Sequence, residues 1–285
     1  MTALTVVRES TAALQQPPPI SPEVATRWLV AFLRDEIVER RGMHRAVIGL
    51  SGGVDSAVTT YLSSLALGPE NVYAFRLPYK TSSPESLADA QLVIDALGVN
   101  ARTIDISAAV DGYLQFEPDA DARRCGNVMA RTRMLVLFDQ SAKLGALPVG
   151  TGNKTERLLG YFTWHADDTP PVNPIGDLFK TQVWALARYL GVPQKLIDKA
   201  PSADLEADQT DEGDLGITYA RADAILAQML LGYTDEQLFE RGFDAPDVTL
   251  VRRRVESTHW KRHLPTTAML TNTAINEFYL RPVDY

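Results

Sequence analysis

The sequence contains only one cysteine, Cys125, among its 285 residues. A single cysteine excludes a disulfide framework and a multi-cysteine metal site within the chain, and it is typical of a reducing compartment. No histidine lies near Cys125 in the sequence. We therefore interpret it as a buried or incidental residue rather than as the nucleophile of a glutaminase.

Positive charge and long apolar segments are also scarce. The 28 basic residues are outnumbered by 36 acidic ones, for a formal net charge of −8. This balance disfavours broad binding to nucleic acids or anionic membranes, although a local basic patch stays open. Residues 1–20 carry no apolar run of signal-peptide length, and no other run is long enough to span a bilayer. We therefore expect a cytoplasmic protein with neither nucleic acid nor a membrane as partner.

Length and composition favour one large folded domain. Hydrophobic residues make up 45% and charged residues 22% of the chain, as in ordinary globular proteins. The proline run at 17–19 indicates that residues 1–20 form a flexible leader. Ser21 is a candidate helix N-cap and Pro22 follows it, so we place a single domain at 21–285.

An apolar stripe follows Ser21 in the sequence. Its members recur at helical spacing, which predicts an amphipathic helix. They are Val24, Trp28, Leu29, Phe32, Leu33 and Ile37. We expect this face to pack in the core or against a partner subunit.

Short apolar runs alternate with helix-forming segments in the middle of the chain. The predicted strands, which are buried and parallel, span residues 46–50, 72–77, 101–106 and 146–150. The predicted helices between them span 55–67, 85–97 and 127–144. This alternation predicts an α/β fold, with a doubly wound, mostly parallel sheet flanked by helices. Beyond residue 180 the pattern predicts a helical and loop-rich C-terminal part.

The most informative motif is Ser51-Gly52-Gly53-Val54-Asp55-Ser56, between a predicted strand and a predicted helix. Glycines let the backbone approach a phosphate, and the free amides of a helix N-terminus favour an anion. The motif is not a Walker A loop, because no Gly-Lys-Ser/Thr follows it. A second glycine-containing loop, 150–154, follows the fourth predicted strand. Ligands bind at the carboxyl ends of parallel strands, so the two loops predict a phosphate site at one edge.

The first loop resembles the pyrophosphate loop of the N-type ATP pyrophosphatases, enzymes that split ATP into AMP and pyrophosphate. Further segments resemble the ammonia-dependent NAD synthetases of this superfamily, over roughly residues 21–270. These segments are 130–134, 150–156, 160–163, 174–182, 201–205 and 215–219.

The resemblance implies an adenine-nucleotide α-hydrolase-like fold and a single NAD synthetase domain over 21–285. It implies that ammonia amidates deamido-NAD (nicotinic acid adenine dinucleotide) to NAD through an adenylated intermediate, with release of pyrophosphate and AMP. ATP is then a co-substrate, Mg²⁺ is the cofactor, and the working unit is a homodimer with substrate sites near the subunit interface. Because the chain begins almost directly at the synthetase part, we expect no fused glutaminase domain.

By the same resemblance, each site residue has an expected role. Asp55 and Glu156 hold magnesium, and Asp55 and Lys180 are catalytic, with Lys180 stabilising the departing pyrophosphate. ATP is bound by Gly49, Leu50, Ser51, Gly52, Gly53, Val54, Asp55, Ser56, Thr151, Lys180 and Ser202. The acceptor is bound by Arg131, Trp164, Pro171, Trp260 and Lys261.

Structural interpretations of several of these residues stay open. Glu156 and Lys180 could form a surface salt bridge without a catalytic role. Arg131 and Arg133 lie two residues apart on a predicted helix and cannot share a face, so one of them is expected to be structural. The acidic segment 203–214 is either a solvated loop or, as in the resembled family, a lid that orders over substrate, and we favour the lid.

Three acceptor-side positions depart from the family pattern. Trp164 stands where bacterial members often carry a lysine, Pro171 stands near an expected aspartate, and Trp260 precedes Lys261 where the family has a histidine. The tryptophans are either core residues or stacking partners for a pyridine or adenine ring. Amidation of nicotinic acid mononucleotide by the same chemistry therefore stays open, as does, less favoured, a non-catalytic nucleotide-binding module. An RNA-modifying pyrophosphatase is disfavoured by the single cysteine and the negative charge.

Overall fold

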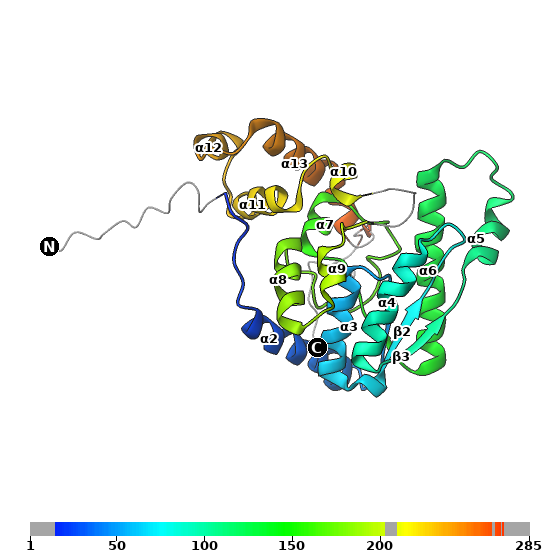
Figure 1. Ribbon diagram of the computed structural model, residues 1–285. Coiled ribbons are helices and arrows are strands. Elements are labelled where there is room, and N and C mark those ends of the chain that lie inside the picture. The colour runs from blue at the N-terminus through cyan, green and yellow to red at the C-terminus, as the bar shows by residue number, and fades with distance from the viewer. Residues whose placement is uncertain (1–14, 203–209, 264–265, 269, 271–285) are drawn as a thin grey trace.

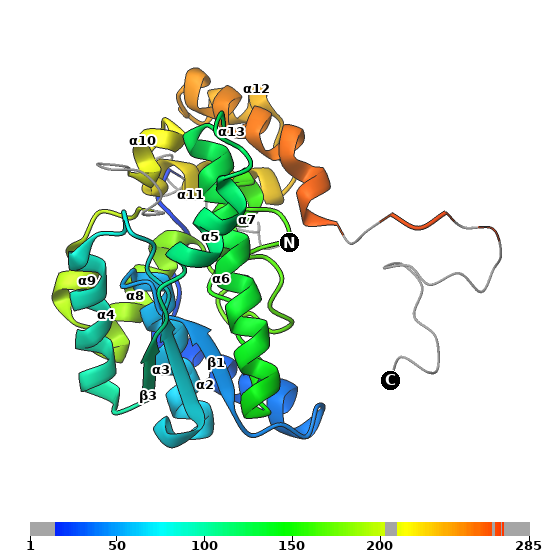
Figure 2. The ribbon, with the colours of Figure 1, turned by 90° about the vertical axis from the view of Figure 1, so that its right-hand side faces the viewer.

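Four short strands form one parallel sheet in the order β3-β2-β1-β4, and Figures 1 and 2 show strands of this sheet between helices. The computed structural model describes residues 15–202, 210–263, 266–268 and 270. The strands are β1 (Ala46–Gly49), β2 (Val72–Arg76), β3 (Asn100–Thr103) and β4 (Leu147–Pro148). All their pairings are parallel, which confirms the predicted parallel sheet, with each strand shorter than expected. The expectation that all four strands are buried is wrong for β3, whose four residues are exposed at the edge of the sheet.

Helices cover both faces of the sheet because alternate strand residues are apolar toward opposite sides. Ile48 and Ala74 pack into a core shared with α2 (Pro22–Arg34), α3 (Val54–Leu67), α4 (Pro84–Leu97) and α8 (Lys180–Leu190). Val47 and Phe75 pack on the other side, against α5 (Ser107–Leu114) and α6 (Ala122–Leu144). The doubly wound α/β fold is confirmed.

The order of the strands reverses between β1 and β4. From β1 the chain moves outward to β2 and β3, and then returns to place β4 on the other side of β1. Connections on opposite faces leave a crevice at the carboxyl ends of these two strands. Both predicted phosphate loops follow the strands that border this crevice, because residue 51 comes two positions after β1 and residue 150 two positions after β4.

The C-terminal part is helical, as expected, and has its own apolar core. The helices around this core are α7 (Lys154–Leu159), α10 (Asp211–Leu215), α11 (Tyr219–Leu230), α12 (Asp235–Glu240) and α13 (Ala245–Thr258). In contrast, α9 (Gln194–Asp198) packs into the core of the sheet through Leu196 and Ile197. Three further short helical segments are a π-helix, η1 (Asp35–Glu39), and two 3-10 helices, η2 (Pro69–Asn71) and η3 (His259–Arg262). Figure 1 shows α11, α12 and α13 grouped at one end of the molecule, away from the strands.

The first helix begins as predicted. Ser21 Oγ accepts a hydrogen bond from the backbone N–H of Val24, and Pro22 occupies the first turn. The apolar stripe of α2 and the turn after it is divided: Leu33 and Ile37 are buried, whereas Trp28 is 74% exposed. The packing expectation is thus confirmed for the inner residues only.

Part of the predicted leader contacts the folded chain. Gln15 Nε2 donates to the carbonyl oxygen of Gly242 at 2.7 Å, and Gln182 Nε2 donates to that of Pro18 at 3.1 Å. Residues 1–14 lie outside the described residues. Within the described chain, no helix combines the length and the apolar character needed to cross a membrane.

Candidate functional site

The serine-glycine loop after β1 is organised by its own hydroxyl groups. The backbone N–H of Ser51 donates to Ser56 Oγ at 3.2 Å, and that of Gly53 donates to Ser51 Oγ at 3.3 Å. The two serine hydroxyls lie 3.1 Å apart. These hydrogen bonds within the loop hold its shape at the N-terminus of α3. Its apolar neighbours Leu50 and Val54 are buried and anchor it.

Gly52 has a structural reason to be glycine. Its φ is +85°, and a Cβ at this position would lie 2.2 Å from the carbonyl oxygen of Ser86 in α4. A side chain would therefore meet both backbone strain and a direct clash. The loop can hold this shape against α4 only with glycine at position 52.

Lys180 joins three elements that are distant in the sequence. Its Nζ lies 2.5 Å from Asp55 Oδ2 in α3 and 3.2 Å from Glu156 Oε1 in α7. The Lys180 side chain is 2% exposed, and each carboxylate side chain is 17% exposed. The surface salt bridge considered from sequence is therefore wrong, since the group is a buried ion cluster. The structure brings together all three residues that the sequence assigned to magnesium and phosphate chemistry.

The electrostatics of this cluster keep Lys180 positively charged. Burial raises the pKa of Glu156 to about 8. Burial opposes the charged form of Lys180, but the carboxylates of Asp55 and Glu156 outweigh it and raise the pKa of Lys180. The ring of Tyr219 lies 5.0 Å from the ammonium and adds a favourable cation–π contact. Lys180 is therefore a stable, fixed positive charge.

Asn153 is a site residue that the sequence reasoning missed. It is fully buried, and its Nδ2 donates to Asp55 Oδ1 at 3.0 Å. Its Oδ1 accepts from the backbone N–H of Glu156 at 3.0 Å, and Glu156 Oε2 accepts from the backbone N–H of Asn153. This reciprocal pattern is a capping box, and Asn-x-x-Glu at 153–156 was the signal that could have revealed it. Asn153 thus fixes both carboxylates.

The loop after β4 is held by the segment at 172–173. The backbone N–H of Gly150 donates to the carbonyl oxygen of Val172, and Asn173 Nδ2 donates to that of Gly152, both at 2.7 Å. Thr151, expected to bind ATP, is half-buried in this loop. Ser202, also expected to bind ATP, is exposed at the end of its described segment.

The acidic segment expected to act as a lid is described only in part. Residues 203–209 lie outside the described residues. The backbone N–H of Asp211 donates to the carbonyl oxygen of Pro201 at 2.9 Å, so the two ends of the segment are joined. Asp211 is buried and accepts a hydrogen bond from the Tyr219 hydroxyl at 2.9 Å, and burial raises its pKa.

Three expected acceptor residues gather beside the loop 160–171. Arg131 donates to the carbonyl oxygen of Trp164 at 3.0 Å, and the rings of Trp164 and Trp260 meet edge to face at 5.2 Å. Trp260 is 51% exposed and is not a core residue. His165 adopts a φ of +57°, which is unusual for a non-glycine residue. Pro171 is exposed at the end of the loop.

Lys261 and Arg133 both contact backbone carbonyls. Lys261 Nζ donates to the carbonyl oxygens of Gly160, at 2.7 Å, and Phe162. Burial lowers the pKa of Lys261. Arg133 Nε donates to the carbonyl oxygen of Leu77 at 3.1 Å. Of the two arginines compared from sequence, Arg133 is thus the one that joins α6 to the end of β2.

The carboxylates of Asp55 and Glu156 fit a magnesium ion bound with a nucleotide. They already flank a cationic group, the Lys180 ammonium. Mg²⁺ in such sites is held by one or two carboxylates together with substrate phosphates and water. The described residues contain no group of three or more His, Cys, Asp or Glu side chains able to bind a metal. A magnesium ion here would therefore depend on the nucleotide for its remaining ligands.

The fold and this site define an α/β protein with two loops at a switch point of its parallel sheet, the place where such folds bind nucleotides. A family model described as NAD synthase matches residues 25–265. The chain belongs to the NAD synthase family, whose members are ligases that form a carbon–nitrogen bond.

Curated relatives extend over most of the chain. The NH(3)-dependent NAD(+) synthetase of Trichlorobacter lovleyi is 48% identical over 267 residues, covering 93% of this chain and 97% of that protein. The protein of the same name in Chlorobaculum parvum is 48% identical over 245 residues, covering 86% and 88%. The resemblance inferred from the sequence motifs is therefore confirmed.

Solved structures share the fold over the same extent. The NMN synthetase of Francisella tularensis has a TM-score of 0.78 at 32% identity, covering 88% of this chain and 99% of that one. The NH3-dependent NAD synthetase of Campylobacter jejuni has a TM-score of 0.75 at 30% identity, covering 88% and 100%. These likenesses confirm the family's fold for this chain.

Proposed function

We propose that the protein amidates deamido-NAD with ammonia at the expense of ATP, through an adenylated intermediate. The observation that carries this proposal is the buried Lys180 ammonium between Asp55 and Glu156, next to the serine-glycine loop. The names of the curated relatives support the same reaction.

In the first step the nicotinate carboxylate attacks the α-phosphorus of ATP, and the bond to pyrophosphate breaks. Both reactants are anions, so positive charge must lie where negative charge develops. The loop 51–56 and the N-terminus of α3 bind the phosphates, and Lys180 stabilises the departing pyrophosphate. Asp55 and Glu156 would hold Mg²⁺, which supplies Lewis-acid charge neutralisation on the phosphate oxygens.

In the second step ammonia attacks the acyl carbon of the adenylate, and AMP leaves as the amide forms. The acceptor nucleotide lies against Arg131 and the Trp164–Trp260 pair. Edge-to-face indoles offer ring faces on which a pyridine or adenine can stack. Lys261 fixes the loop that carries Phe162 and Trp164, through the carbonyl oxygens of Gly160 and Phe162.

A panel of acceptor acids tests the proposal. Purified protein receives ATP, Mg²⁺ and ammonium with deamido-NAD, nicotinic acid mononucleotide, nicotinate or no acid, and AMP and amide are measured. We expect AMP and amide in equal amounts with deamido-NAD. AMP formation that needs no acid, or nucleotide binding without any turnover, would contradict the proposal.

Nicotinic acid mononucleotide is the second candidate acceptor. Similarity to the NMN synthetase structure of Francisella tularensis favours it, and so do the departures at Trp164, Pro171 and Trp260. The ratio of kcat/KM for the two acceptors in the same panel decides between them. A ratio in favour of the mononucleotide would replace the dinucleotide as the substrate while leaving the adenylation chemistry in place.

We propose further that the enzyme works in the cytoplasm, because a chain with a single cysteine suits reducing conditions.

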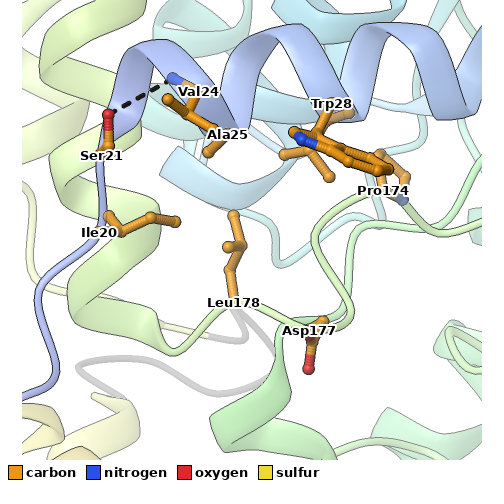
Figure 3. A pocket seen from close by; sticks show the side chains of 9 residues that line it. Ile20, Ser21, Val24, Ala25, Trp28, Pro174, Asp177 and Leu178 are labelled. Carbon is orange, nitrogen blue, oxygen red and sulfur yellow. Dashed lines mark hydrogen bonds between the residues drawn. The ribbon is translucent and has the colours of Figure 1, made fainter.

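We also propose that two copies of the chain associate through α2. Trp28, Val24 and Phe32 form an exposed apolar stripe on this helix. Figure 3 shows Trp28 beside Pro174 at one end of an apolar groove of about 290 Å³, which Ile20 and Leu178 also line. Isolated apolar residues are common on surfaces, but a continuous stripe beside a groove is typical of an interface. The resemblance to a dimeric family makes a second copy the expected occupant.

A further inference from the structure

Asp223 is a fully buried carboxylate that has no part in the proposed reaction. It lies on α11 and is 0% exposed. Its Oδ1 accepts a hydrogen bond from Thr155 Oγ1 at 2.5 Å, and its Oδ2 accepts from the backbone N–H and hydroxyl of Thr181, at 2.9 and 2.7 Å. Burial of a carboxylate is costly unless hydrogen bonds compensate for it. Each of these three bonds leads to one of two threonines.

The two threonines are chain neighbours of two residues in the ion cluster. Thr155 precedes Glu156 in the first turn of α7, and Thr181 follows Lys180 in the first turn of α8. Thr155 Oγ1 also accepts from the backbone N–H of Lys180 at 3.0 Å. Asp223 therefore holds the first turn of α7 against the first turn of α8. These two turns carry Glu156 and Lys180, and Lys180 Nζ lies 3.2 Å from Glu156 Oε1.

The start of α8 depends on this clamp. Its N-cap residue, Phe179, makes no side-chain capping bond. The backbone N–H groups of Lys180 and Thr181 bind Thr155 and Asp223 instead. A carboxylate at a helix N-terminus is favourable, because it meets the positive end of the helix dipole. The tertiary contacts through Thr155 and Asp223 thus add to the local bond from the Phe179 N–H to Gln182 Oε1, at 2.9 Å, in holding the first turn of α8.

A second residue of α11 contacts the Lys180 side chain. Tyr219 is one helical turn before Asp223, so both project from the same face of α11. The Tyr219 ring lies 5.0 Å from Lys180 Nζ. The helix α11 therefore contacts the Lys180 ammonium through Tyr219. Through Asp223 it also positions the backbone at Lys180 and Thr181.

We propose that Asp223 is a positioning residue of the amidation reaction, which holds Lys180 in register with Asp55 and Glu156 by clamping the first turns of α7 and α8. The inference rests on the proposed function and extends it to a residue that touches no substrate. A misplacement of about 1 Å at a charge-stabilising group can lower a rate about 100-fold. The clamp therefore has a kinetic consequence that a purely structural carboxylate would lack.

The first test is Asp223→Asn, which keeps the shape but replaces one acceptor oxygen by an NH₂ group. We expect kcat for pyrophosphate release to fall about 10- to 100-fold, with the KM for ATP changed less than about twofold. Asp247→Asn is the matched control, because it removes an aspartate that pairs with Arg221 at 2.6 Å in the same helical part. The control should keep the wild-type kcat. A folded Asp223→Asn protein with wild-type kcat, or an equal loss in the control, would overturn the proposal.

A pair of variants at Thr155 keeps the test independent of the folding of Asp223→Asn. Thr155→Ser retains the hydroxyl that binds both Asp223 and the backbone of Lys180, whereas Thr155→Val retains only the volume. We expect Thr155→Ser to keep kcat within about twofold and Thr155→Val to lose it about as Asp223→Asn does. Equal turnover in the two variants would refute the clamp.

Combination with Lys180→Met separates this inference from the proposed function. If Asp223 acts through Lys180, the double variant has the same residual kcat as Lys180→Met alone. Losses that multiply would show that Asp223 acts elsewhere. The absence of acid-dependent AMP formation in the wild type would contradict the proposed function itself, whereas a loss in Lys180→Met beside a normal Asp223→Asn would contradict only the positioning role.

Discussion

At the scale of single residues, Lys180 connects the fold to the chemistry. It is the first residue of α8, yet its ammonium reaches carboxylates from α3 and α7. The charge is nearly excluded from water. Electrostatic interactions in such a buried site are stronger than at a surface. A buried positive charge that needs no rearrangement is suited to stabilise a departing pyrophosphate.

The first prediction replaces this charge by Lys180→Met. Turnover should fall at least about 100-fold, with a smaller change in the KM for ATP, because the charge matters most as the pyrophosphate leaves. The fold should survive, since burial raises the pKa of Glu156 and this carboxyl can hold a proton when the ammonium is gone. Steady-state kinetics measure both constants. Unchanged turnover with weaker ATP binding would show that the lysine only positions the nucleotide.

The second prediction concerns the two carboxylates. Asp55→Asn and Glu156→Gln should each abolish AMP formation, because each removes a negative charge from the expected Mg²⁺ site without a change of shape. The amide introduced by Asp55→Asn keeps an oxygen for the hydrogen bond from Asn153 Nδ2, so circular dichroism should show an intact fold. AMP formation at the wild-type rate and ordinary magnesium would contradict the assignment.

At the scale of elements, the loops at the starts of helices hold the site, and the loop before α3 packs closely against α4 at Gly52.

The third prediction is that the Gly52→Ala protein unfolds at a lower urea concentration than the wild type. Both the φ of +85° and a Cβ 2.2 Å from the carbonyl oxygen of Ser86 oppose alanine at this position. Gly98→Ala is the control: its φ is +68°, with nothing within 4 Å of the new Cβ. The control should lose about 1–2 kcal/mol, and Gly52→Ala clearly more. Equal losses would show that the contact with α4 is unimportant.

The loop that carries Trp164 makes stability depend on pH. Asp167 Oδ1 accepts a hydrogen bond from the backbone N–H of Thr163 at 2.9 Å. Burial raises the pKa of Asp167 to about 6, with Asp168 adding to the rise and Lys261 opposing it. The value in an unfolded chain is about 3.9. Between these two values the folded protein binds more protons than the unfolded chain, so this group lowers stability as pH rises.

The fourth prediction follows from that sign. Asp167→Asn keeps the oxygen that accepts from Thr163 but cannot titrate. The free energy of unfolding of the wild type, relative to this variant, should therefore fall from about pH 4 to about pH 6 and then level off. Urea denaturation across this range measures the difference. A difference that stays constant, or rises with pH, would contradict the raised pKa.

At the scale of the whole molecule, α2 lies between the core and the surface. Its inner side reaches the core through Leu33, while Trp28 stands 74% exposed above the groove in Figure 3. An exposed tryptophan beside an apolar groove has the chemistry of an interface anchor. The proposed homodimer would bury both.

The fifth prediction tests this surface with Trp28→Glu. Loss of an aromatic anchor from an interface costs about 2 kcal/mol or more, so the dimer dissociation constant should rise at least about 30-fold. Leu231→Glu is the control, since Leu231 is equally exposed, at 73%, but lies after α11. Sedimentation at several concentrations measures both. A dimer weakened only by Leu231→Glu would move the interface to the C-terminal helices.

Particular residues show which features could be predicted from the sequence. The six-residue loop, the alternating strands and the capping serine at 21 are local features, and the structure has each of them where the pattern predicted. The sequence analysis missed Asn153 and Asp223, because a buried polar residue is recognised by its partners. These partners are distant in the sequence: Asp55 lies 98 residues from Asn153, and Thr155 lies 68 residues from Asp223. The ligand roles of the site residues stay predictions until they are measured.

The sequence by itself determined the family, the parallel α/β sheet and the two loops at its edge, because these follow from short motifs and from apolar periodicity. Only the tertiary structure decided that Lys180 is a buried charge between two carboxylates, and that Lys261 binds backbone carbonyls. The physical reason is that burial and pairing are properties of elements packed together. A side chain's spacing along the chain fixes its local conformation, but not the charges that it meets.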